Sequence, residues 1–227
     1  MGVAHDLVLL TTDPQSGKSY ISSTVSDAVL GGALLLELVT AERLAVKGEG
    51  RRARVQVLDK HPLGDPLLDE ALGRLVDRKP QKPANAVTRL GKRAQKQVCA
   101  ELAEQRVVAP RVVKILGLFP TTRHDVLDTR RRSELASGVK ACVLRGARPD
   151  DVTGPLIALL SAADILKPLV GKRDAKAAKA RAKKIAAGDG STEWASKGVR
   201  EAVQAANAAV AAGVAASVAA TSASGGG

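Results

Sequence analysis

The stretch DAVLGGALLLELVTAERL at residues 27–44 decides the fold of this 227-residue chain. Its apolar positions run all the way round at the centre, which is typical of a helix that is buried on every side. Ser26 stands immediately before the stretch and is predicted to be its N-cap. Residues 20–24, just upstream, favour an extended conformation. We therefore expect a buried helix that begins at about Asp27.

The segments on either side of this helix predict a mixture of helices and short hairpins. Strands are expected at residues 44–46 and 54–58, on either side of the charged turn KGEGRR. DPLLDEALGRLV at residues 65–76 begins as a helix should, with Pro66 in its first turn. Val107–Phe119 is β-branched and interrupted by Pro110 and Gly117, which suits a second hairpin. Further helices are predicted at residues 131–145, 152–170, 172–187 and 191–220.

Two segments allow more than one interpretation. Residues 6–12 (DLVLLTT) fit either a strand or the end of a helix, and residues 172–184, rich in Ala, Lys and Arg, fit either an exposed helix or a mobile loop. The uncharged stretch from residue 202 to 227 is long enough to raise the question of a membrane span. Alanine is nearly neutral for insertion, so a buried terminal helix with a Ser/Gly tail is the better prediction.

The clearest amphipathic pattern covers residues 87–104. Its apolar residues recur at three- and four-residue steps on one face: Val87, Leu90, Ala94, Val98 and Leu102. The interpretation is one continuous amphipathic helix.

The face opposite those residues carries the strongest functional signal. Residues 78–100 contain seven Lys or Arg and no acidic residue. Four of them, at i, i+3, i+4 and i+7, share one helical face: Arg89, Lys92, Arg93 and Lys96. Like charges at this spacing repel, so their presence without interleaved carboxylates predicts an anionic partner; a solvated face is the alternative. Residues 167–184 form a second basic run, and residues 130–132 a third.

Composition agrees with a polyanion-binding surface. The net charge is +12, which bears on partners rather than on fold. The aromatic residues are Tyr20, Phe119 and Trp194 alone, so the core must be aliphatic. Cys99 and Cys142 lie in apolar-periodic segments and are expected to be buried free thiols.

Nothing in the sequence predicts catalysis. SGKS at residues 16–19 lacks the first glycine of a phosphate-binding loop, because Thr12 stands in its place, and it is better interpreted as a turn. His5, His61 and His124 are isolated from any nucleophile motif. We expect no catalytic residue, no metal site and no cofactor, and hence not an enzyme.

Five segments, in order, resemble the Golgi phosphoprotein 3 family, which includes bacterial members. They are ISSTVSDAVLGGALLLELVTAERLAV at residues 21–46, DPLLDEALGRL at 65–75, the amphipathic segment, the hairpin ending in FPTTRHDV at 119–126, and LIALLSAADILKPL at 156–169. The resemblance implies a mainly α, single globular domain with amphipathic helices around a buried central helix plus short β-hairpins. That domain would cover residues 1–221, followed by a flexible Ser/Gly tail at residues 222–227.

The same resemblance implies a function. Family members bind phosphatidylinositol 4-phosphate through a basic pocket, capture cytosolic tails of membrane proteins, and oligomerise through a β-hairpin, here Val107–Phe119. The pocket positions of the eukaryotic members correspond to Ser22, Gly31, Lys92 and Gln95, of which only Lys92 is basic. We therefore expect anion binding through Arg89, Lys92, Arg93 and Lys96, with less selectivity for the headgroup.

The leading hypothesis is a cytoplasmic, peripheral membrane protein that binds anionic lipid and serves as an adaptor. The alternative is a nucleic-acid-binding protein in which the buried helix and the hairpin at residues 44–58 form a winged-helix-like element. Scarce aromatic residues and few base-reading amides make nucleic acid the weaker hypothesis. A role as an oligomeric interaction protein is compatible with membrane binding.

Overall fold

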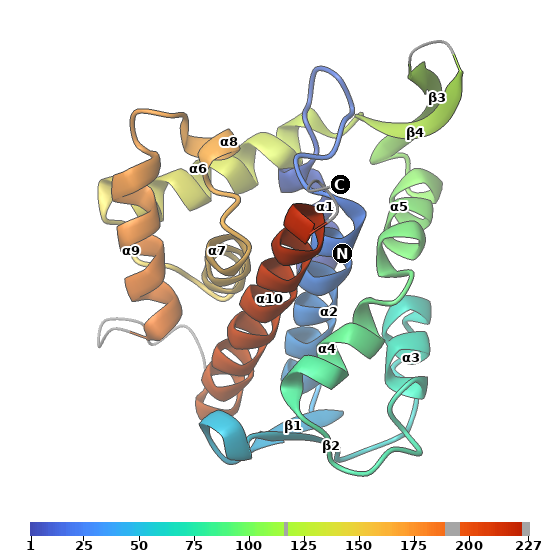
Figure 1. Ribbon diagram of the computed structural model, residues 1–227, viewed down its shortest axis with the longest axis vertical. Coiled ribbons are helices and arrows are strands. Elements are labelled where there is room, and N and C mark those ends of the chain that lie inside the picture. The colour runs from blue at the N-terminus through green and yellow to red at the C-terminus, as the bar shows by residue number, and fades with distance from the viewer. Residues whose placement is uncertain (116–117, 189–195, 224–227) are drawn as a thin grey trace.

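The computed structural model describes residues 1–115, 118–188 and 196–223, and shows one central helix surrounded by others (Figure 1). This central helix is α2 (Ser23–Thr40), and nearly all of its residues from Val29 to Val39 are buried. The prediction of a buried helix in this stretch is therefore confirmed. Within the described residues, α2 is also the one helix long and apolar enough to cross a membrane, and its burial by neighbouring helices identifies it as the core helix of this fold.

The described part of the chain is mainly helical with two small antiparallel sheets, as predicted. In order, the elements are α1 (Val3–Thr11), α2, β1 (Leu44–Lys47), the 3-10 helix η1 (Gly50–Arg52), β2 (Arg54–Val57), α3 (Pro66–Gly73), α4 (Pro83–Gly91), α5 (Ala94–Glu104), β3 (Val108–Ile115), β4 (Phe119–Val126), α6 (Thr129–Arg145), α7 (Thr153–Ala162), α8 (Lys167–Val170), α9 (Ala175–Ala187) and α10 (Lys197–Ala223).

Helix α10 lies antiparallel to α2 along most of its length (Figure 1). Close contacts fix this pairing at two levels, because Gly213 faces Ala28 and Gly32 faces Val210. Ala202, Ala206 and Val210 are completely buried or nearly so. The C-terminal stretch is therefore a helix packed inside the protein, as expected. Residues 191–195 of the predicted helix and residues 224–227 of the predicted tail lie outside the described residues.

The start of α2 differs from the prediction. The N-cap is Ser22, whose Oγ accepts a hydrogen bond from the Val25 N–H, and not Ser26, which is buried within the helix. Residues 20–24 are consequently not an extended segment. The reason lies upstream, where Ser19 bridges to Thr12 and the chain has already completed its short antiparallel turn. The next residues are therefore available to begin the helix one turn early.

The helices predicted at residues 87–104 and 152–170 are each broken in two. The second breaks at Asp164, which has a left-handed φ of 57°, while the Ile165 N–H bonds back to the Leu160 carbonyl and closes the end of α7. Pro168 cannot donate a backbone hydrogen bond, so the helix cannot run through it. The first break forms part of the candidate site.

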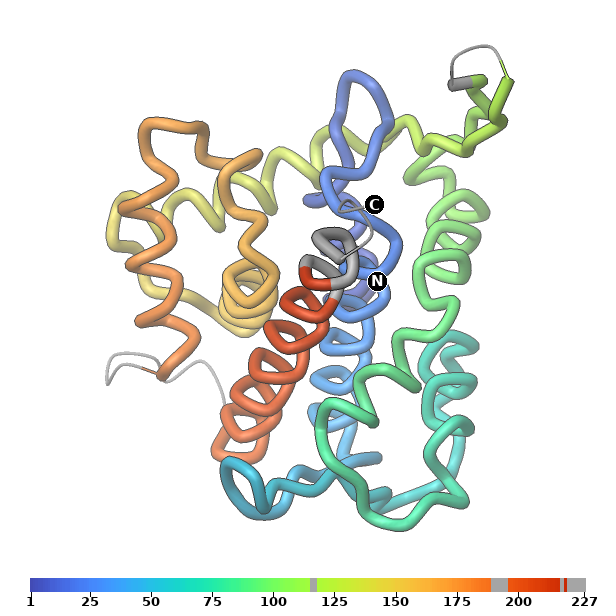
Figure 2. The backbone as a smooth tube through the Cα atoms, in the orientation of Figure 1, coloured from blue at the N-terminus to red at the C-terminus, as the bar shows by residue number. Residues whose placement is uncertain are grey.

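The two hairpins are confirmed. Strands β1 and β2 pair from Leu44–Val57 to Lys47–Arg54. Strands β3 and β4 pair from Val108–Val126 to Ile115–Phe119, so the second strand of this hairpin is the FPTTRHDV segment at residues 119–126. In Figure 2 the β3–β4 hairpin projects away from the helices, beyond the end of α5.

The N-terminal segments resolve the remaining alternatives. Residues 6–12 lie mostly in α1, so the helical interpretation holds. The SGKS segment lies in a turn in which Asp13 accepts backbone hydrogen bonds from Gln15 and Ser16. The Gly17 carbonyl accepts a hydrogen bond from the His124 N–H, which fastens this turn to β4.

The segment rich in Ala, Lys and Arg is a helix rather than a loop over most of its length. Residues 175–187 form α9, whose Ala178, Ala182 and Ile185 are buried.

Candidate functional site

The basic segment lies where α4 ends and α5 begins, next to a close crossing of α4 and α2. Gly91, the last residue of α4, lies so near α2 that a Cβ on it would stand 1.9 Å from the carbonyl oxygen of Asp27. Gly31 on α2 makes the reciprocal approach, since a Cβ there would stand 2.1 Å from the Val87 carbonyl oxygen. Only glycine permits backbones to approach this closely.

After this crossing the chain turns sharply before α5. Arg93 adopts a left-handed conformation with φ 62°, which ends any continuous helix, and α5 begins at Ala94. The predicted single helix with four cations on one face is therefore wrong. Arg89 lies in the last turn of α4, Lys92 and Arg93 form the link, and Lys96 lies in the first turn of α5. We call these four residues the basic turn.

The apolar residues opposite the basic turn are all buried, as the periodicity predicted: Val87, Leu90, Ala94, Val98 and Leu102. A two-residue link keeps them directed at the core although the helix axis changes. Arg74 supports the end of α4, because its Nη1 donates to the Leu90 carbonyl at 2.7 Å. It thereby satisfies one of the carbonyls that a helix C-terminus leaves without a partner.

The cations of the basic turn are exposed and available to a ligand. Among the described residues, Lys92, Arg93 and Lys96 form no ion pair or side-chain hydrogen bond, and Arg89 donates only to the neutral Gln81 oxygen at 3.2 Å. Of the two acidic side chains on neighbouring α3, Glu70 is already bound by Arg74 and by Gln97, and Asp69 accepts hydrogen bonds from the backbone of Leu63 and Gly64. The positive charge of the turn is therefore not neutralised from within the described part of the fold.

The structure also explains the positions that correspond to the family's headgroup pocket. Ser22 caps α2 with its side chain. Gly31 has no room for any side chain, because it packs against the backbone of α4. Gln95 is half-buried, whereas Lys92 is exposed. Gly31 and Lys92 nonetheless lie close together, since Gly31 contacts the residue that precedes Lys92.

The third basic run serves the interior of the fold. Arg131 donates from Nε and Nη2 to the buried carboxylate of Asp6, and Arg132 donates from Nε to the carbonyls of Leu9 and Thr12 at the end of α1. These contacts fasten α6 to α1. Arg130 is exposed and pairs with Glu134 one turn later, so it is the one member of this run that faces solvent.

The second basic run, residues 167–184, lies on α8 and α9, at the opposite edge of the molecule from α4 and α5 (Figure 1). Helices α2 and α10 stand between them. Lys179 pairs with Asp164 at 2.8 Å, while Lys172, Lys176 and Lys183 are exposed. The two runs therefore do not merge into one patch. The basic turn is the candidate anion site because it contains Lys92, the one basic residue among the positions that correspond to the family's pocket.

The titratable groups of the core were not found by sequence reasoning. His5 is not isolated: it is buried, its Nδ1 accepts from the Gly2 N–H, and its Nε2 lies 2.9 Å from Glu101 on α5. These contacts fit a neutral ring whose Nε2–H donates to the carboxylate. His5 and Glu101 are 96 residues apart in the sequence, so no local pattern could reveal this contact.

Glu37 is a second titratable group that contacts the core, and its side chain is half-buried. It accepts a hydrogen bond from the Ala4 N–H at 2.8 Å and so helps to satisfy the N-terminus of α1. Burial raises the pKa of Glu37 to about 7. Burial also raises the pKa of the Cys99 thiol to about 11, and both Cys99 and Cys142 are buried and free, as predicted. Within the described residues, no group of three or more His, Cys, Asp and Glu side chains could hold a metal ion.

The burial of α2 argues against a winged-helix-like element. The helix that precedes the β1–β2 hairpin is α2, and a recognition helix must be exposed to enter a DNA groove. Helices α4, α7 and α10 cover α2 instead.

Comparison with known proteins identifies one family. The sequence model of the Golgi phosphoprotein 3 (GPP34) family matches residues 3–206, which is nearly the whole chain. No curated protein matches the chain.

Proposed function

Because the chain belongs to the Golgi phosphoprotein 3 family, we propose that it is a cytoplasmic, peripheral membrane protein that binds anionic lipid headgroups through the basic turn. The observation that carries this proposal is the set of exposed cations on the α4–α5 link, which lack acidic partners among the described residues. Family membership favours a membrane over other polyanions. The family is not known as an enzyme family.

The charge of the basic turn is sufficient for reversible docking. A Lys or Arg close to an anionic membrane contributes about 1 kcal/mol, so the four residues together contribute roughly 4 kcal/mol before screening by salt. Lys92 and Arg93 are both exposed on the link between α4 and α5.

We expect this site to bind acidic headgroups without the selectivity of the eukaryotic members. Phosphatidylinositol 4-phosphate recognition there depends on positions that correspond to Ser22, Gly31 and Gln95, none of which supplies a charge here. A substitution at Gly31 could not restore a charged side chain, because the backbone of α4 leaves no room for one. Phosphate charge, rather than the pattern of phosphates on one headgroup, would then determine affinity.

Sedimentation with vesicles tests the proposal. We expect binding to vesicles that contain phosphatidylserine or phosphatidylinositol 4-phosphate at equal surface charge, with similar affinities, and none to neutral vesicles. Equal binding to neutral vesicles would refute it. So would a salt-dependent shift with duplex DNA at protein concentrations that leave acidic vesicles unbound.

The β3–β4 hairpin supplies a second part of the proposal, namely contact between copies of the chain. Val112, Leu118 and Phe119 are 69%, 76% and 65% exposed, which is unusual for large apolar side chains on a projecting hairpin. Sizing by light scattering should show a smaller assembly when Leu118 and Phe119 are both changed to Ser. Leu127→Ser, also exposed but outside the hairpin, is the matched control. Capture of cytosolic tails of membrane proteins, which the resemblance implies, stays a prediction.

A further inference from the structure

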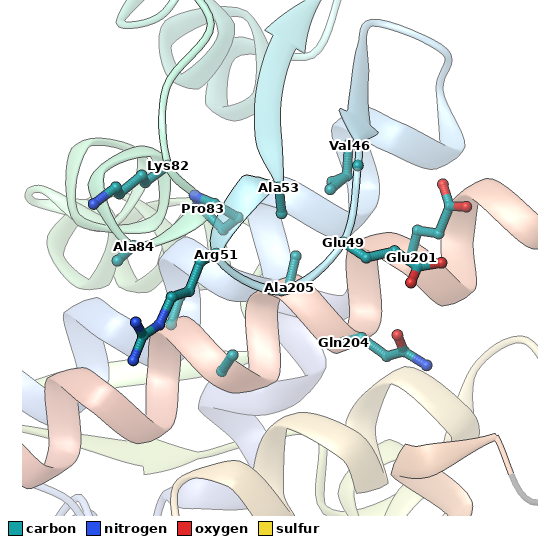
Figure 3. Close-up of a pocket in the computed structure, with 14 residues that line it drawn as sticks. Val46, Glu49, Arg51, Ala53, Lys82, Pro83, Ala84, Glu201, Gln204 and Ala205 are labelled. Carbon is teal, nitrogen blue, oxygen red and sulfur yellow. The ribbon is translucent and has the colours of Figure 1, made fainter.

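A cleft of about 720 Å³ lies at the end of α4 opposite the basic turn (Figure 3). Three elements form it: the β1–β2 connection, the start of α4 and the first half of α10. Its volume is that of a small-molecule site. The lining residues that the argument uses are Glu49, Arg51, Lys82, Glu201, Ala205 and Ala209.

Charge is segregated along this cleft. Arg51 and Lys82 lie at one end, whereas Glu49 and Glu201 lie at the other (Figure 3). In the part of the chain that the structure describes, none of these four side chains has an ion-pair partner. Opposite charges thus line one cleft without neutralising each other, because they occupy different ends.

The wall between the two ends is apolar and smooth. Ala205 and Ala209 on α10 are buried and line the cleft. Val46, Ala53 and Pro83 add further apolar surface to its lining. Small side chains here leave the volume open instead of filling it. A ligand that crosses from one charged end to the other would lie against hydrocarbon.

We propose that this cleft binds a phosphate–ammonium zwitterion, the chemistry of ethanolamine phosphates. The Arg51 guanidinium can donate two parallel hydrogen bonds to a phosphate, and Lys82 adds a second positive charge beside it. Glu49 and Glu201 supply two carboxylates for the ammonium group. The apolar wall between the two ends is suited to the carbon atoms that join the phosphate to the ammonium group. This proposal does not depend on the basic turn, since the two sites share no residue.

Titration calorimetry on the full chain separates the sources of such a ligand. The probes are O-phosphoethanolamine, monomeric lysophosphatidylethanolamine, inorganic phosphate and ethanolamine. We expect the zwitterions to bind at least about tenfold more tightly than either half-molecule, because each half satisfies one end only. Tighter binding of the lysolipid than of phosphoethanolamine identifies a lipid, and equal binding identifies a soluble headgroup. Failure of both zwitterions to bind, or binding of phosphate as tightly as of phosphoethanolamine, overturns the proposal.

Substitutions at each end localise the binding. Arg51→Gln and Glu201→Gln should each weaken binding of the zwitterion about tenfold, through loss of one charge-assisted contact. Arg52→Gln is the matched control, since Arg52 is the next residue, is equally exposed and does not line the cleft. It should bind like the wild type. An equal loss in Arg52→Gln, or none in the other two variants, overturns the assignment. None of the three side chains is buried, and circular dichroism checks that each variant folds.

Discussion

Replacement of Gly91 by Ala should destabilise the protein strongly, although it adds a single methyl group. The new Cβ would stand 1.9 Å from the Asp27 carbonyl oxygen and must reach about 3.4 Å for ordinary contact, so the two helices must separate by about 1.5 Å. The clashing atoms belong to the backbone, so no rotamer change relieves them. Separation would loosen Ala86, Val87 and Leu90, which are buried between α4 and the core.

Overpacking of this kind costs about 3 kcal/mol at the upper end of its usual range, which exceeds the gain of about 1 kcal/mol from replacing Gly by Ala in a helix. In a chain of this length, each kcal/mol lowers Tm by roughly 2–4 °C. Urea and thermal unfolding followed by circular dichroism would measure the loss. Gly73→Ala is the control, because no atom lies within 4 Å of its new Cβ; it should be neutral or stabilising. If Gly91→Ala is as stable as Gly73→Ala, the close crossing of α2 and α4 is wrong.

Three further outcomes follow from the core. Because burial raises the pKa of Glu37 from 4.5 to about 7, the folded state retains a proton that the unfolded chain releases. The contribution of this proton to the free energy of unfolding is therefore fully present below about pH 4.5 and is lost, by roughly 3 kcal/mol, as the pH rises through 7. Urea unfolding at about pH 5 and about pH 8 should show this loss in the wild type and not in Glu37→Gln. Arg131→Gln should cost about 2 kcal/mol because it leaves a buried carboxylate without its partner, whereas Arg130→Gln should cost nothing measurable. Cys99 and Cys142 should resist a thiol reagent until denaturant is added, and rapid labelling of the native protein would contradict their burial.

Sequence periodicity was sufficient to predict the elements and buried residues that depend on local pattern. The continuous apolar run at residues 27–44 predicted the central helix, and the charged turn with two glycines predicted the β1–β2 hairpin. The spacing of Val87, Leu90, Ala94, Val98 and Leu102 correctly selected the buried residues of α4 and α5. These features depend on neighbours in the chain, which a single sequence contains.

Features that depend on distant residues could not be predicted. Gly91 approaches a part of α2 that lies some sixty residues earlier in the chain, and the helix breaks two residues later, at Arg93. The apolar spacing continues across this break, so periodicity alone does not reveal it. Likewise, Arg131 and Arg132 look like part of a basic cluster in the sequence, whereas in the fold they lie on α6 and donate hydrogen bonds to Asp6 and Leu9 of α1. Charge patterning therefore counted Arg131 and Arg132 as surface cations, although both serve contacts between α6 and α1.

A comparison of two matched triple variants tests the central claim most directly. The turn variant carries Lys92→Gln, Arg93→Gln and Lys96→Gln. The α9-side variant carries Lys172→Gln, Lys176→Gln and Lys183→Gln, all exposed on the opposite edge of the molecule. Both lose three positive charges, so net charge alone cannot distinguish them.

The measurement is the dissociation constant for phosphatidylserine vesicles at one fixed salt concentration. Loss of three cations at about 1 kcal/mol each should weaken binding of the turn variant by roughly a hundredfold. The α9-side variant should bind nearly as well as the wild type, apart from a small long-range effect of charge. Equal weakening of the two variants, or a turn variant that binds like the wild type, would contradict the assignment of the basic turn as the membrane-binding site.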